Sequence, residues 1–226
     1  MSTATITRLG AGAGAAYVGL VIVGNDVLGT GESPVPGARP AEFARWLAEN
    51  RPIGAGWIGP FLELVGVLCF VVFAATLFTT LRNAEQERTW LPTAALGAGL
   101  VSAAIKLSSA PAMLAAFELA KDGIDPQLGT ALVEMNGYAF LLTWAVDAVM
   151  IGAVAAVALR TGVLPRWLGI SAAVIAPLLL VSLAGGADAP PVFLLALIWF
   201  VAVSVVLVRP ASRARRTASP AAPAAS

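Results

Sequence analysis

Long apolar runs separated by short polar segments constrain the fold of this chain more than any other feature. Six such runs cover residues 9–28, 57–81, 91–117, 136–159, 164–183 and 190–208. A bilayer core about 30 Å thick is crossed by a helix of about 20 apolar residues, so each run is long enough to span it. Within lipid, a helix satisfies its own backbone hydrogen bonds. We therefore predict an all-α polytopic membrane bundle of six transmembrane helices, forming one domain over residues 1–208.

Composition excludes several classes of protein. Charged residues make up 12% of the chain, whereas they make up about 25% of an ordinary soluble domain. The chain has no histidine, which excludes His-ligated zinc or haem and Ser-His-Asp catalysis. Its single cysteine, Cys69, lies in an apolar run and cannot form an intrachain disulfide. The net charge of +1 provides no field that would favour nucleic acid. We expect no metal, no cofactor and no nucleic-acid partner.

The distribution of lysine and arginine about the runs predicts the orientation. With the N-terminus inside, the inner segments hold Arg8, Arg82, Arg88, Arg160, Arg166, Arg209, Arg213, Arg215 and Arg216, and the outer segments hold Arg39, Arg45, Arg51 and Lys121. Because cytoplasmic loops carry the excess of basic residues, both termini are expected in the cytoplasm. This pattern, with the richness in alanine, arginine and glycine, is typical of a multi-pass protein of the bacterial inner membrane.

The first run also has the outline of a signal peptide, since Arg8 precedes it. However, glycines thin its apolar stretch, and no clear cleavage site precedes a soluble domain. Gly10 and Gly14 have the spacing of close helix packing in membranes. We therefore expect the run to be retained as a helix.

Two segments outside the runs have patterns of their own. Phe43, Trp46 and Leu47 are spaced i, i+3, i+4 within residues 40–50, which predicts a short amphipathic helix in the first outer loop. That helix would pack on the bundle or lie at the membrane surface.

Residues 209–226 contain four arginines followed by Ala, Pro and Ser. This composition is typical of a disordered basic cytoplasmic tail.

Three charged residues, Glu63, Lys106 and Asp147, lie within the apolar runs. A charge at the bilayer centre costs roughly 2.5–3.5 kcal/mol on insertion scales, so such residues face the protein interior, pair with each other or line a wet cavity. At 1.5 Å per residue, Lys106 and Asp147 both lie roughly 16 Å from the outer ends of their runs, and Glu63 roughly 9 Å. Lys106 can therefore meet Asp147 or reach toward Glu63. Asp26, near the outer end of the first run, is a candidate fourth member.

Other residues on the same helical faces complete a predicted polar pocket in the outer half of the bundle. Ser109 shares a face with Lys106, and Asn136 and Trp144 share one with Asp147. Two interpretations stay open. The charges form a buried ion pair that fixes helix register, or they form a site for a ligand or a proton. Because one base faces two or three acids, the surplus acid must be protonated, hydrated or paired with a bound cation.

Three short motifs resemble a large, uncharacterised bacterial family of six-span membrane proteins, known as a domain of unknown function. The first is GPFLEL at residues 59–64, with its intramembrane glutamate. The second is a basic residue in the third run, here Lys106, where the resemblance leads us to expect an arginine. The third is AFLL at 139–142, leading to GVLPRWLG at 162–169. The resemblance covers residues 7–208.

The resemblance implies a six-helix integral membrane protein in the bacterial inner membrane, without an established activity. Asp147 departs from what we expect in the family, which makes it a local partner for Lys106. The lipid bilayer is the expected partner, with a small-molecule or lipid ligand in the pocket or an accessory role in the membrane. Two alternatives stay open: a membrane-embedded enzyme acting on a lipid or isoprenoid by carboxylate general acid chemistry, and a proton-coupled transporter.

Overall fold

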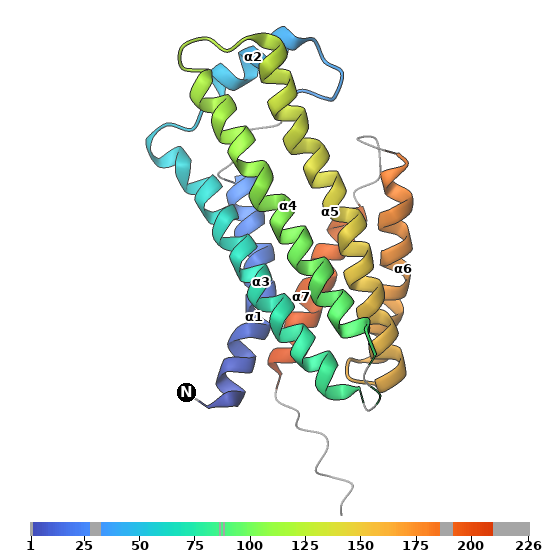
Figure 1. The fold of residues 1–226 in the computed structure, drawn as a ribbon. Coiled ribbons are helices and arrows are strands. Elements are labelled where there is room, and N and C mark those ends of the chain that lie inside the picture. Colours follow the sequence, from blue (N-terminus) through green and yellow to red (C-terminus); the bar gives the residue numbers. More distant parts are fainter. Residues whose placement is uncertain (1, 28–32, 86, 88, 186–191, 210–226) are drawn as a thin grey trace, which may run out of the picture.

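A computed structural model describes residues 2–27, 33–85, 87, 89–185 and 192–209, and every regular element in these ranges is helical (Figure 1). The α-helices are α1 (Thr3–Ile22), α2 (Pro40–Glu49), α3 (Ile58–Ala84), α4 (Leu91–Leu119), α5 (Pro126–Thr161), α6 (Arg166–Leu183) and α7 (Val192–Val208). A π-helical turn, Val23–Val27, continues α1, and a 3₁₀ turn, Gly54–Trp57, leads into α3. The predicted disordered tail beyond Arg209 lies outside the described residues.

Five helical segments of the described chain are long and apolar enough to cross a membrane. They are Thr5–Asn25, Gly54–Ala84, Leu91–Leu119, Pro126–Thr161 and Arg166–Leu183. The helix α7 is apolar throughout but shorter, at 17 residues. This agrees with the predicted helical membrane bundle.

The five long helices and the shorter α7 form a closed ring in the described chain. In order of contact the ring runs α1, α3, α4, α5, α6, α7 and back to α1, so the first and last helices are neighbours. Figure 1 shows an elongated bundle with α2 across one end. We call this end the α2 end. The N-terminus and the last turn of α7 lie at the opposite end.

Helix α5 starts at Pro126, ten residues before the run from Asn136 that the sequence predicts as a span. The side chain of Asp125 accepts a hydrogen bond from the Leu128 amide at 3.0 Å, and proline occupies the first helical position. Together they nucleate the helix outside the apolar run. The helix ends at Gly162, whose φ of 70° is accessible to glycine at little cost.

The predicted short helix after the first run is present as α2. Its buried residues Phe43 and Leu47 pack against Ala116 and Phe117 of α4 and Val133 of α5, in a hydrophobic cluster separate from the main core. The early start of α5 thus supplies part of the surface on which α2 rests.

Glycines of α1 allow it to approach its neighbours closely. A Cβ at Gly14 would lie 2.6 Å from the Phe73 ring, and a Cβ at Gly24, in the π-helical turn, would lie 2.6 Å from the backbone oxygen of Gly59. Side chains would therefore push α1 away from α3. This contact brings Tyr17 into the centre of the ring.

Candidate functional site

A buried polar cluster lies inside the ring, and Lys106 of α4 is its centre. Its Nζ donates a hydrogen bond of 2.5 Å to the hydroxyl oxygen of Tyr17 on α1 and lies 5.0 Å from the centroid of the same ring. Tyr17 is only 1% exposed and packs on Phe70, with ring centroids 4.8 Å apart. Asp147 of α5 and Glu63 of α3 are close enough to interact electrostatically with the ammonium group. The cluster therefore joins four helices.

Of the two interpretations that the sequence leaves open, a direct ion pair between Lys106 and a carboxylate is not seen among the described residues. Between the residues that the structure describes, the ion pairs are Arg39–Glu42 and Lys121–Glu118, both at the surface. The reason is Tyr17, which the sequence analysis did not include. It comes from a run that reads as uniformly apolar, and its hydroxyl group reaches the ammonium at hydrogen-bond distance while both acids stay further away.

Asp147 is buried, with 8% of its surface exposed, yet its Oδ1 has no hydrogen-bond partner among the described residues. The hydroxyl of Ser102, which is fully buried, faces this carboxylate as a hydrogen-bond donor. Leaving a buried polar group unpaired costs about 1–3 kcal/mol, and more for a charged one. Ser102 was also missed by the sequence analysis, although it precedes Lys106 by four residues on the same helical face.

Glu63 differs from its neighbours on α3. The buried residues of this helix form a single stripe: Gly59, Gly66, Val67, Phe70, Phe73, Ala74, Leu77 and Leu81. Glu63 lies on this stripe, four residues after Gly59 and three before Gly66. Its side chain is nevertheless exposed. The interior face of α3 is therefore packed below Glu63, whereas Glu63 itself is accessible, roughly two turns nearer the α2 end than Lys106 by helix rise.

Trp144 lies one turn from Asp147 along α5, toward the α2 end. It is 5% exposed, and its ring contacts Phe193 of α7 and Phe140, with centroids 5.6 and 5.7 Å away. Its Nε1 makes no hydrogen bond within the described chain. These three rings form an aromatic group beside the cluster, between Asp147 and the α2 end.

The remaining candidates are not brought into the cluster. The Ser109 hydroxyl donates to the Lys106 carbonyl oxygen at 3.0 Å, which is a bond within its own helix. Asn136 shares a face of α5 with Asp147 but lies roughly 16 Å further along it. The backbone of Asp26 belongs to the π-helical turn, whereas its side chain lies outside the described part of the structure.

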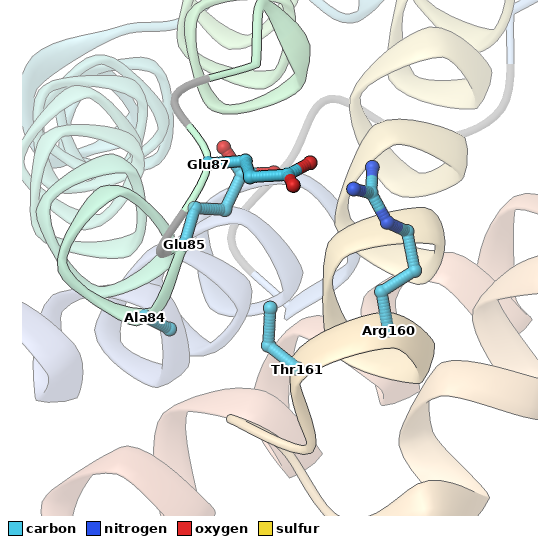
Figure 2. Close-up of a pocket in the computed structure, with 5 residues that line it drawn as sticks. All are labelled: Ala84, Glu85, Glu87, Arg160 and Thr161. Carbon is cyan, nitrogen blue, oxygen red and sulfur yellow. The ribbon is translucent and has the colours of Figure 1, made fainter.

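A second polar feature lies at the opposite end of the bundle. Figure 2 shows a cleft there, with the carboxylate of Glu87 directed toward the guanidinium of Arg160 and Glu85 beside it. The cleft has a volume of about 340 Å³ and is also lined by Ala84 and Thr161. The Glu85 carboxylate accepts hydrogen bonds from the amide and hydroxyl of Thr89, at 3.2 and 2.7 Å. It thus stabilises the turn between α3 and α4, and no residue of the cleft belongs to the buried polar cluster.

The apolar helical ring with charges held inside it defines a multi-pass membrane protein. The chain belongs to the family described as Domain of unknown function (DUF4386), which matches residues 12–209. Membership of an uncharacterised family is what the resemblance predicted. Comparison with curated proteins finds no match, and neither does comparison with solved structures. The description of the family assigns no activity, so a functional proposal depends on the cluster.

Proposed function

We propose that the chain crosses the bacterial inner membrane six times, with the α2 end outside and both termini in the cytoplasm. Residues 1–208 are then the membrane domain, and 209–226 a cytoplasmic tail. Two features support this. The N-terminus and the last turn of α7 lie at the same end of the bundle, and a helix of 17 residues is about 26 Å long, close to the bilayer core.

The function that the geometry supports best is binding of a small molecule or lipid in an outward-facing polar pocket. The exposed carboxylate of Glu63, on a helical stripe that is otherwise buried, is the observation that carries this proposal. Lys106 and Asp147 form the floor of the pocket, and the aromatic group around Trp144 forms part of its wall. A purely architectural ion pair would have its charges bonded to each other and enclosed, whereas here Lys106 makes no direct ion pair and Glu63 is exposed.

Cysteine labelling from outside the cell tests the pocket. In a Cys69→Ala background, Glu63→Cys should react with a membrane-impermeant maleimide, because water reaches this position. Val67→Cys, 3% exposed on the same stripe, and Leu68→Cys, 52% exposed on the opposite face toward lipid, are the controls and should not react. Labelling after denaturation in SDS verifies that each cysteine is present. A Glu63→Cys variant that stays unlabelled, while Arg51→Cys in the outer loop reacts, would contradict the proposal.

A further inference from the structure

We infer that the ligand of this pocket carries a positively charged amine, an inference that rests on the proposed pocket. The first argument is charge balance. Within the cluster, one ammonium group, Lys106, faces two carboxylates, Glu63 and Asp147. In a low-dielectric bundle an uncompensated charge is expensive. A ligand with one positive charge would bring the cluster to neutrality. A ligand with one negative charge would double the net negative charge of the cluster.

The second argument is the hydrogen bonding of Lys106. Its ammonium is directed to the neutral hydroxyl of Tyr17 and is half-buried behind that ring. One of the three N–H donors of this base is therefore directed to the α1 side. The carboxylates, by contrast, make no ion pair within the described residues. The acids are thus the groups that remain to recognise a ligand.

An independent observation points to the same chemistry. Asp147 is more than nine-tenths buried, and its Oδ1 has no hydrogen-bond partner in the described chain. Buried polar atoms in native proteins are nearly always satisfied by protein, water or a bound group. A carboxylate oxygen accepts hydrogen bonds, and an ammonium group is purely a donor.

The surroundings favour an organic amine over a metal cation. No group of three or more acidic, histidine or cysteine side chains able to hold a metal occurs in the described ranges. The aromatic group of Trp144, Phe140 and Phe193 lies between Asp147 and the α2 end, where a ligand would enter. Aromatic rings attract organic cations through their π faces, best of all tryptophan.

Three water-soluble probes of one shape test the inference: benzylamine, benzyl alcohol and benzoate. The full-length protein is purified in a neutral detergent, and its Tm is followed as each probe is titrated. Benzylamine should raise Tm in a saturable way, and the other two should not. In Glu63→Gln, half-saturation should need at least a tenfold higher concentration. Glu49→Gln is the matched control, since it removes the same charge at an exposed position of α2 and should bind as the wild type does.

Stabilisation by benzoate instead of benzylamine would overturn the inference, as would equal binding of benzylamine to the wild type and Glu63→Gln. Stabilisation by NaCl but not by KCl, without an effect of benzylamine, would point to a metal cation and overturn it too. Absence of any probe effect rejects an amine ligand, whereas the labelling of Glu63→Cys decides separately whether the pocket exists.

Discussion

Tyr17 gives the buried lysine a partner that is polar but uncharged. Hydrogen bonds to charged groups are stronger than those between neutral groups. Both carboxylates lie beyond ion-pair distance of this ammonium, and the cluster has a surplus of acid because two acids face one base. The phenolic oxygen of Tyr17 thus holds the ammonium on the α1 side of the cluster.

Removing the hydroxyl oxygen of Tyr17 should lower the stability of the protein. We expect Tyr17→Phe to lower the free energy of unfolding by about 1.5–3 kcal/mol, the usual contribution of a hydrogen bond to a charged group. Tyr138→Phe makes the same chemical change at a position that is 57% exposed, and its effect should stay within about 0.5 kcal/mol. Unfolding by SDS in mixed micelles measures both. Equal stability of the two variants would show that the bond to Lys106 contributes nothing.

The elements themselves were largely predictable, because apolar runs bounded by polar residues form helices in lipid. The start of α5 was missed, since hydropathy marks where a helix enters the membrane and not where it begins. The Asp125–Pro126 pair, with its capping side chain, carried that information locally. The three intramembrane charges were found for the same reason that the runs were, by their rarity in apolar sequence.

The partners of those charges could not be found in this way. A tyrosine in an apolar run reads as one more hydrophobic residue. Its contact with Lys106 depends on α1 packing beside α3 next to α4, an arrangement that spacing along the chain does not encode. The exposure of Glu63 is likewise a property of the assembled ring.

The close contact between α1 and α3 makes a prediction about the helix pair. Gly24→Ala should destabilise the protein by about 1–3 kcal/mol, because the added methyl group meets a backbone oxygen that cannot rotate away. Gly19→Ala, on the same run with nothing within 4 Å, should be neutral or stabilise by up to about 1 kcal/mol through helix propensity. Thermal unfolding of the two variants gives the comparison, and a stable Gly24→Ala protein would refute the packing.

On the scale of the whole molecule, the described chain has two hydrophobic cores of unequal role. The larger one holds the ring of helices together, and the smaller one fastens α2 across the end where Glu63 is exposed. Because the cores share no buried residue, loss of the smaller one should leave the ring folded.

Removing a side chain from the smaller core should therefore weaken the packing of α2 on the bundle and leave the ring of helices unchanged. Leu47→Ala removes a fully buried side chain, a change that usually costs about 2–5 kcal/mol. In spheroplasts we expect faster cleavage by external trypsin at Arg45, with the Tm of the bundle nearly unchanged. Ile53→Ala, 72% exposed, should be cut at the wild-type rate. A large fall in Tm for Leu47→Ala would show that the two cores unfold together.

The bond between Tyr17 and Lys106 also bears on how the chain is made. Its two ends are 89 residues apart, and the N-terminal partner leaves the ribosome first. When the helix with the lysine enters the lipid, a hydroxyl acceptor is already there, whereas Asp147 has yet to be synthesised. The bond therefore allows the nascent chain to give the Lys106 ammonium a hydrogen-bond acceptor in the membrane before α5, α6 and α7 are inserted.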